Sequence, residues 1–532
     1  MSLVRMEKGV LCLAVVLFLE LPRLYAVQSS PITENDQVAT IELEQANRSP
    51  KWWRFPVSRP LPIVEPLAEK LGERLAKFPF GKRAEFEGLP EKPISFISAH
   101  RIYSLQDFIQ IAMMNDDTLK TARKQIELAL AKLTEAKRAL FPNATLRSAI
   151  TEGKTRTAPF EEKEFIFRLE QPLLDGGGLK ATLNQAQVNL EIARSQYDKV
   201  LLDLRFEVEK NYYELAKLLL QLDVQRGMLK EAEPILDLAK KELDAEVITL
   251  LEYLNVQTLQ QQLLYQYHSA EKDIQIAQMN LQHTLTVSAD PKILIDYQLA
   301  FPEFKKNLEE CQRVAILRRP EVLINYLLVK FHKYGKKIGE AKKRWKVDLA
   351  ASYGTSASAF EGEDLSFGDD FFVGMQVSRP IGIHSLTSSY TSQQTAPKLG
   401  QSDRTESTAI SSEAGLFNQY GGIAEEKELE VSYRQAVDEF KKIKKSVQSE
   451  VSQAYFNGEK SAMLYEAQKQ KLEFRQKGIA VIDLQQKINE AMVSQVLEAR
   501  IQLAQEQIAL VSALADYCIS LAGLNQATGY SL

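Results

Sequence analysis

The residues of this chain that could take part in catalysis or metal binding are scattered rather than grouped. The five histidines, His100, His268, His283, His332 and His384, have neither metal-ligand spacing nor a nucleophile pattern beside them. His268 and His283 fall within helical pattern, so we interpret them as surface or interhelix residues. The sequence therefore predicts no catalytic centre, no cofactor and no metal, and we expect the protein not to be an enzyme.

One glycine-rich segment has the composition of an anion-binding loop. Asp175-Gly176-Gly177-Gly178 follows a predicted strand and opens a predicted helix, a position where backbone N–H groups can hold a phosphate. The Lys-Ser/Thr continuation of a phosphate loop is absent, so we interpret the segment as a strand-to-helix turn. Basic clusters such as Lys342-Lys343-Arg344 alternate with acidic or apolar residues, and the net charge is −4. These features argue against a nucleic-acid partner.

The overall composition is typical of a soluble protein, but the N-terminus has the pattern of an export signal. The 532 residues are 45% hydrophobic and 26% charged, and the mean hydropathy is −0.24. Arg5 and Lys8 precede an apolar run over 10–21, and Ala26 offers a cleavage site, a pattern that predicts a signal peptide over 1–26. Beyond Ala26 we find no apolar stretch near the roughly 18 residues of a membrane-spanning helix. We therefore expect an exported protein without a helical anchor.

The segment after the signal peptide differs from the rest of the chain. Residues 27–100 contain nine of the 19 prolines, which predicts an extended N-terminal extension. After cleavage only Cys311 and Cys518 remain. Two distant cysteines do not form a disulfide framework, so we expect two separate buried thiols, with a single bridge as the alternative.

Two very long helices are predicted downstream of Ser104. Ala, Leu, Gln, Glu and Lys dominate there, and these residues favour helix. One apolar or small stripe between Ala186 and Leu222 recurs about every 3.6 residues, the period of a straight helix. A helix over 179–243 would be roughly 95 Å long at about 1.5 Å per residue, and a second one is predicted over 423–484. A helix of this length is longer than a compact globular domain, so the sequence predicts an elongated protein.

An internal repeat accounts for the pair of long helices. Glu207-Val208-x-x-x-Tyr212-Tyr213 recurs as Glu450-Val451-x-x-x-Tyr455-Phe456, and Gln171-Pro172-Leu173 recurs as Arg379-Pro380-Ile381. We therefore predict two copies of one unit, over 101–290 and 301–532.

The second copy contains extra residues. Between 385 and 412 the chain has 13 Ser or Thr residues, a composition typical of low-complexity segments. We predict an inserted loop over 384–420. The sequence leaves open on which side of the surrounding structure this loop lies.

Each copy also carries a predicted β-hairpin, over 144–171 and over 347–379. The strand residues alternate between apolar and polar, as they do in membrane β-barrels, although a half-buried soluble sheet alternates in the same way. Four strands cannot close a barrel, whose minimum is about eight, so a barrel requires several chains. The residues expected to face lipid are Phe165, Phe167, Leu169, Phe371, Val373, Met375 and Val377.

The doubled order of these features resembles the TolC-type outer-membrane efflux protein family over about residues 104–529. The resemblance rests on Leu105…Ala112-x-x-Asn115, Phe141-Pro142, Gln171-Pro172-Leu173-Leu174-Asp175-Gly176-Gly177 and Leu521-Ala522-Gly523. It implies a fold that is mainly α with a small β part. It also implies a homotrimer in which each chain gives four strands to one twelve-stranded outer-membrane β-barrel and its long helical hairpins to a periplasmic α-barrel.

The resemblance further implies a passive duct in the outer membrane, with a large periplasmic part. Its partners would be outer-membrane lipid, a periplasmic adaptor protein and an inner-membrane pump, in tripartite efflux or type I secretion. The rival interpretation is a periplasmic coiled-coil adaptor or envelope spacer without a channel, which shares the signal peptide and long helices but needs no alternating strands.

The duct would be gated at the helix tips, near 243–250 and 489–496. Family turns of this kind usually contain a glycine, whereas Glu246 and Ala491 stand in those places here. The residues expected to face the adaptor are Val247, Ile248, Thr249, Met492, Val493 and Ser494.

Overall fold

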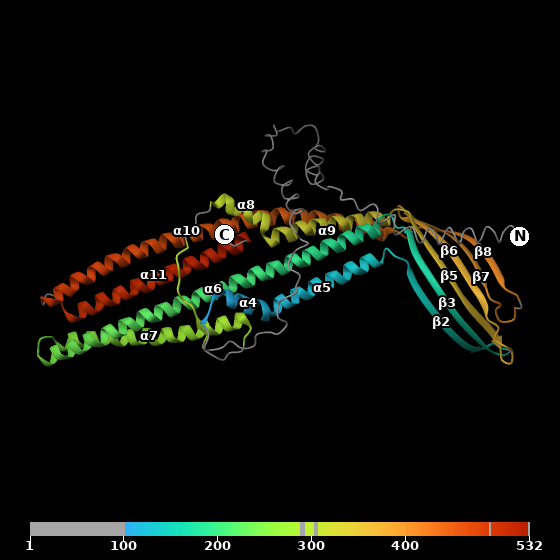
Figure 1. The fold of residues 1–532 in the computed structure, drawn as a ribbon. Helices are drawn as coiled ribbons and strands as arrows, with labels where there is room; N and C mark the ends of the chain where they lie inside the picture. The colour runs from blue at the N-terminus through green and yellow to red at the C-terminus, as the bar shows by residue number, and fades with distance from the viewer. Residues whose placement is uncertain are drawn as a thin grey trace, which may run out of the picture. The chain divides into compact units, whose positions relative to one another are not determined.

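The computed structural model describes residues 102–156, 158–287, 293–302, 307–401, 403–488 and 491–529. The predicted signal peptide (1–26) and the proline-rich extension (27–100) lie outside the described residues. The predicted fold class, mainly α with a small β part, is confirmed: long helices continue into one sheet (Figure 1).

Two copies of one unit follow each other along the chain. The first copy consists of β1 (Ile102–Tyr103), α4 (Leu105–Asn115), α5 (Asp117–Arg138), β2 (Asn143–Lys154), β3 (Pro159–Leu174), α6 (Gly178–Asp244) and α7 (Leu250–Leu285). The second consists of β4 (Leu294–Ile295), α8 (Leu308–Arg318), α9 (Pro320–Lys342), β5 (Lys346–Phe360), β6 (Gly368–Ile381), β7 (His384–Thr395), β8 (Thr405–Gly415), α10 (Tyr420–Lys487) and α11 (Val493–Thr528). The order is the same in both copies except for β7 and β8.

The helices begin where the sequence supplies caps. Ser104 and Asp107 form a capping box at α4, and the Asp116 side chain accepts a hydrogen bond from the Leu119 N–H at the start of α5. Pro320 occupies the first turn of α9, where its missing N–H has no intrahelical partner in any case. The long helices α6 and α10 have 67 and 68 residues, or about 100 Å each at about 1.5 Å per residue.

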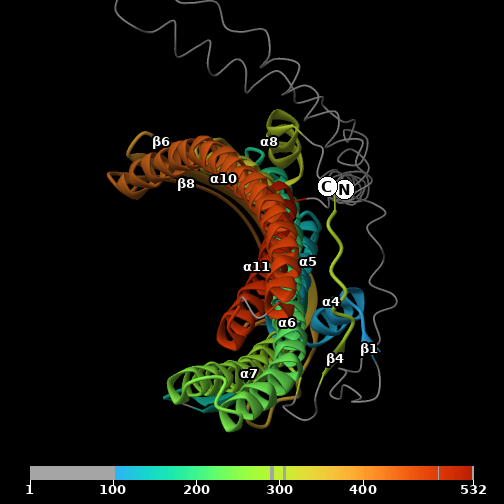
Figure 2. The ribbon, with the colours of Figure 1, turned by 90° about the vertical axis from the view of Figure 1, so that its left-hand side faces the viewer.

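The helices form one curved layer. Towards the sheet α9 lies between α6 and α10, and towards the other end α11 takes that place, with α7 beside α6. Viewed from the end remote from the sheet, the long helices make an arc (Figure 2). Alanines line the buried stripe of α6, among them Ala193, Ala216 and Ala232, and small residues there allow neighbouring helices to approach closely.

The main core lies where α4 packs against α6 and α7. Phe108, Val208, Leu215, Leu281 and Leu285 are fully buried there. The Asn115 side chain, also buried, donates a hydrogen bond to the Leu285 carbonyl at 3.2 Å. This core holds the short helix of the first copy against its two long helices.

One described helix is apolar enough to cross a membrane by length and composition, which corrects the expectation that no stretch beyond Ala26 reaches that length. This helix is α11, over Val493–Thr528. Its apolarity has another use, because α11 packs against α10 on one side and α6 on the other. A helix with neighbours on two sides needs an apolar surface wider than a single stripe.

The sheet has six strands, in the order β2-β3-β5-β6-β7-β8, and every neighbouring pair is antiparallel. The hairpins predicted over 144–171 and 347–379 are present as β2–β3 and β5–β6. The predicted number of four strands per chain is wrong, because the expected loop over 384–420 forms a third hairpin, β7–β8. Its threonines, with Tyr390 and Ile410, favour extended backbone, and Pro397 and Gly400 fall in the connection between the strands.

The glycine-rich segment after β3 is a strand-to-helix turn, as predicted. Gly176 and Gly177 have φ of +69° and +90°, and a Cβ on Gly176 would lie 2.6 Å from the Ala341 carbonyl oxygen. The Asp175 carboxylate accepts hydrogen bonds from the N–H groups of Gly177 and Leu179. The chain's own carboxylate therefore occupies the position where an external anion would bind.

Cys311 and Cys518 are both buried, and no disulfide joins them in the described chain, which confirms the expectation of two separate thiols. Burial raises the pKa of the Cys518 thiol to about 11. Since the thiolate is the reactive form, we expect neither cysteine to react with maleimide at pH 7.5 in the folded protein, and both to react in urea. A Met463→Cys variant is the control, because Met463 is 70% exposed. Labelling of the native cysteines as fast as that of this control would contradict the prediction.

Candidate functional site

The seven residues predicted to face lipid lie on one face of the sheet. The register aligns Phe167 with Tyr353 and Tyr353 with Phe371, and it aligns Leu169 with Val373 through Ala351. Phe165, Phe167 and Met375 are 50%, 45% and 41% exposed. Large apolar side chains thus form an exposed, continuous surface across the three strands β3, β5 and β6.

The opposite face of the same strands is polar. Arg168 forms an ion pair with Glu170 at 2.7 Å, and Arg147 lies 3.8 Å from Glu164. The aligned positions of β5 are small, with Ser352 opposite Arg168 and Ala350 opposite Glu170. One face therefore suits an apolar medium, and the other suits water.

The third hairpin extends both faces with hydroxyl groups. Ser388 and Ser412 lie 3.0 Å apart on the face of Met375, and Ser389 and Ser411 lie 2.7 Å apart on the polar face. In each pair one hydroxyl group donates a hydrogen bond to the other across the two strands.

At the other end of the long helices, the turn between α6 and α7 is built around a residue with positive φ. Glu246 has φ of +58°; its N–H donates to the Leu243 carbonyl at 3.0 Å, and the Val247 N–H donates to the Glu242 carbonyl at 2.8 Å. This is the Schellman arrangement, in which glycine is the usual residue. The turn therefore keeps the geometry that glycine favours without the glycine.

We expect Glu246→Gly to stabilise the protein by about 1 kcal/mol, because a side chain in the left-handed region costs about 1–2 kcal/mol and glycine removes this strain. Urea unfolding of the detergent-solubilised protein, followed by circular dichroism, measures the change. The matched control is Lys240→Gly, at an exposed position inside α6, which should destabilise by about 1 kcal/mol. Equal destabilisation by both substitutions would refute the account of this turn.

Two contacts join the first tip to the second. The Glu252 carboxylate of α7 accepts a hydrogen bond from the Ser494 N–H, in the first turn of α11, at 3.1 Å. Arg500 of α11 donates to Glu231 of α6 at 3.1 Å and to Asp483 of α10 at 3.3 Å. Separation of the two helical hairpins would break the Glu252–Ser494 and Arg500–Glu231 contacts.

The residues predicted to face an adaptor differ in exposure. Val247 and Met492 are 71% and 60% exposed, Thr249 is exposed and caps α7, and Ile248 is half-buried. Val493 and Ser494 are only 4% and 5% exposed, which corrects their assignment as partner-facing. They are buried because the first turn of α11 packs against α6 and α7.

Other exposed apolar residues at the tips were missed in the sequence. They are Leu250, Leu251 and Ile488, at 60%, 78% and 64% exposed. A Leu-Leu pair directly after the Thr249 cap was an available signal, because the first turn of a helix tip has few neighbours to cover it. Ala491 directly follows residues 489–490, which lie outside the described ranges.

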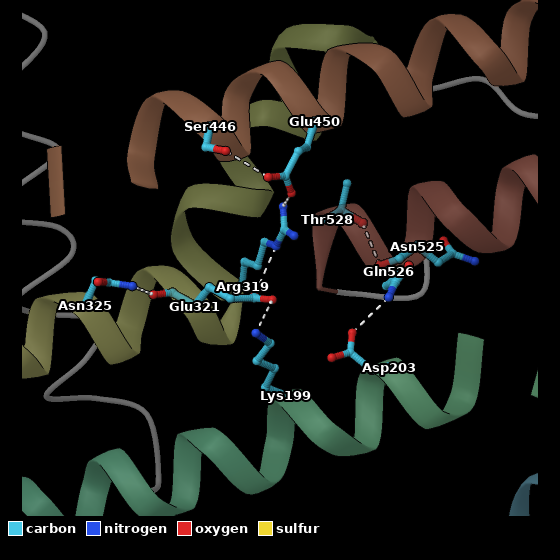
Figure 3. A network of polar contacts seen from close by, with 10 residues as sticks. All are labelled: Lys199, Asp203, Arg319, Glu321, Asn325, Ser446, Glu450, Asn525, Gln526 and Thr528. Carbon is cyan, nitrogen blue, oxygen red and sulfur yellow. Dashed lines mark hydrogen bonds and ion pairs between the residues drawn. The ribbon is translucent and has the colours of Figure 1, made fainter. Parts of the chain in front are cut away.

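A polar network joins the two copies midway along the helices (Figure 3). Arg319, 13% exposed, donates to Glu321 at 3.0 Å and pairs with Glu450 of α10 at 2.5 Å. Lys199 of α6 lies 3.7 Å from Glu321. Nearby, Gln526 of α11 donates to Asp203 of α6 at 2.8 Å. These contacts connect four helices at the level where α8 meets α9.

Titratable groups do not gather into a centre for chemistry in the part of the chain that the structure describes. Within those ranges, no group of three or more His, Cys, Asp or Glu side chains is placed to hold a metal ion. His268 lies on the surface, 3.1 Å from Glu271 of the same helix. The features that suggest a function are the apolar and polar faces of the sheet and the exposed apolar residues at the helix tips.

Comparison with known proteins points to one family. The outer membrane efflux protein family matches residues 108–286. The pyoverdine export outer membrane protein OpmQ of Pseudomonas aeruginosa is 26% identical over 164 residues. That match covers 30% of this chain and 34% of OpmQ, so the matched stretch spans about a third of this curated relative.

Solved structures extend the likeness in fold to both copies. The CmeC outer membrane channel of Campylobacter jejuni is 14% identical, with a TM-score of 0.64 over 80% of this chain and 86% of CmeC. The outer membrane protein VceC of Vibrio cholerae is also 14% identical, with a TM-score of 0.63 over 80% of this chain and 96% of VceC. The match to the outer membrane efflux protein family thus lies in the first copy, and the likeness in fold to solved outer membrane channels extends over both copies.

Proposed function

We propose that the protein is a passive outer-membrane duct for export, one component of a tripartite efflux or type I secretion system. The observation that carries the proposal is the continuity of two structures within one chain. A sheet with one exposed apolar face and one polar face leads directly into helices of about 100 Å. A β-barrel in the outer membrane that continues into a helical tube in the periplasm would form one water-filled path.

A single chain cannot form this path alone. The sheet has two outer strands, and the helical layer is an arc (Figure 2). Barrels cross membranes because closure pairs every strand edge. Three copies arranged around one axis, a homotrimer, would close both the sheet and the helical layer.

The tips suit a protein partner. Val247 and Leu251 at the first turn and Met492 at the second are exposed apolar side chains, and exposed apolar surface marks interaction sites. We assign this surface to a periplasmic adaptor protein, through which an inner-membrane pump would supply cargo and energy. The contacts of Glu252 and Arg500 would hold the tips closed until the adaptor binds.

Membrane fractionation tests the proposal. Cells are separated on a density gradient, and the outer-membrane fraction is then washed with alkaline carbonate. A duct whose sheet is embedded in lipid should stay in the membrane until detergent is added. Release by carbonate alone would refute the duct and support the alternative, a periplasmic coiled-coil adaptor or envelope spacer.

A further inference from the structure

The β7–β8 hairpin is an integral part of the sheet rather than an appendage. Its ladder with β6 runs from Phe371↔Gln394 to Ile381↔His384 without a register shift, and β7 pairs with β8 along its whole length from Ser385 to Thr395. Two residues, Gly382 and Ile383, connect β6 to β7, and Gly382 has φ of +62°. A hairpin with so short a connection must continue the sheet.

This hairpin changes which strand lies at the edge of the sheet. The outer strands are β2, with 12 residues, and β8, with 11 residues. Because successive strands alternate in direction across six strands, β2 and β8 run in opposite directions. The β8 strand of one copy can therefore pair antiparallel with the β2 strand of the next copy over a nearly equal length.

Composition supports this pairing over accidental contacts. The β8 strand carries Glu406 and Glu413 and has no basic residue, whereas β2 carries Arg147 and Lys154 with Glu152. Opposite charges favour a β8–β2 contact and disfavour a β8–β8 contact. Neither strand contains proline or a bulge, the devices that protect an edge intended to stay unpaired.

From these observations we infer that β8 of one copy pairs with β2 of the next, and that three copies close a barrel of eighteen strands. The inference rests on the proposed function and replaces the twelve strands that the family resemblance implied. Barrel diameter grows roughly linearly with strand number, so the barrel is about 1.5-fold wider than one of twelve strands. Barrels of 16–18 strands enclose an open aqueous channel.

The outer face of the third hairpin is apolar at its middle, in Tyr390 and Ile410, and carries hydroxyl groups on either side, in Ser388, Ser392, Thr408 and Ser412. Tyr390 and Ile410 continue the apolar row of Met375, because the register aligns Met375 with Tyr390 and Tyr390 with Ile410. The hydroxyl groups of Ser388 and Ser412 on that face lie 3.0 Å apart. Hydroxyl groups that hydrogen-bond to each other cost less beside hydrocarbon than groups without a partner.

Cysteine cross-linking tests which strand meets β2 of the neighbouring copy. Ser411→Cys, near the middle of β8, is combined in turn with cysteine at each β2 position on the same face. These positions are Asn143, Thr145, Arg147, Ala149, Thr151 and Gly153. A second series replaces Ser411→Cys with Gln376→Cys on the same face of β6. Ser389→Cys with Ser411→Cys is the control, because these side chains lie 2.7 Å apart within one chain and should link without joining copies.

After oxidation of intact outer membranes, non-reducing gels show whether copies are joined. We expect linked dimers and trimers for at least one Ser411→Cys pair and for no Gln376→Cys pair. Linkage through Gln376→Cys would overturn the eighteen-stranded barrel and restore a seam at β6, while the duct would stand. No linkage in either series, in protein that resists carbonate, would also overturn the β8–β2 seam. Release of the protein by carbonate would instead refute the proposed function itself.

Discussion

Replacement of Arg500 and Glu252 by alanine should open the helix tips. In this double variant α11 loses its hydrogen bonds to Glu231 of α6 and to the Glu252 carboxylate of α7, at 3.1 Å each. A partly exposed ion pair contributes up to about 1 kcal/mol, and a carboxylate at a helix N-terminus contributes about 0.3–1 kcal/mol. We therefore expect the free energy that favours the closed tips over the open tips to fall by about 1–2 kcal/mol per chain.

Symmetry amplifies this loss. Three copies that open together lose at least about 3 kcal/mol of the free energy that favours the closed tips. This loss raises the ratio of open to closed tips about 100-fold. Liposomes that contain the variant should swell several-fold faster in an oligosaccharide solution than liposomes with the wild-type protein. The matched control is Arg434→Ala, which removes an exposed pair within α10. Equal swelling rates for the double variant, the control and the wild type would show that these contacts do not close the tips.

Replacement of Arg319 by alanine should have the largest effect on stability. Arg319 is 13% exposed and its partner Glu321 is 19% exposed, so the substitution leaves a mostly buried carboxylate with only Lys199, 3.7 Å away. Breaking a buried pair costs about 3–5 kcal/mol. Glu450 is 45% exposed, so water can solvate its carboxylate after the substitution. We therefore expect Arg319→Ala to lower the free energy of unfolding by about 2–3 kcal/mol.

Thermal unfolding of the detergent-solubilised protein measures this loss. Arg313→Ala is the control, because Arg313 is exposed and donates only to a carbonyl of its own helix; a change within about 0.5 kcal/mol is expected. Adding Glu321→Gln to Arg319→Ala should recover part of the loss, since it removes the unpaired charge. A melting temperature for Arg319→Ala equal to that of Arg313→Ala would contradict the role of the network.

The sequence predicted the elements whose pattern is strong and local. The apolar stripe between Ala186 and Leu222 recurs at the helical period, and α6 forms over Gly178–Asp244. Phe165, Phe167 and Leu169 alternate with charged residues, and β3 forms there. In both cases the contrast between apolar and polar positions is large enough to reveal the period.

The third hairpin was missed because this contrast is absent. Ser388 and Ser389 face opposite sides of β7 yet are the same residue type, so alternation leaves no trace in the sequence. Burial at the tips was hidden for another reason. Val493 and Ser494 are adjacent in the chain to the exposed Met492, and only the packing of α11 against α6 and α7 separates them. By contrast, the missing glycine at Glu246 did not change the turn, because Glu246 itself adopts the left-handed backbone there, with φ of +58°.

Single-channel recording in planar lipid bilayers is the most direct test of the central claim, that this chain forms a water-filled duct. Purified wild-type protein, extracted from the outer membrane with detergent, should insert and give discrete current steps of one size. The Arg500→Ala/Glu252→Ala variant should give larger steps in the same buffer. Folded protein that inserts into the bilayer and passes no current, in both forms, would contradict the account.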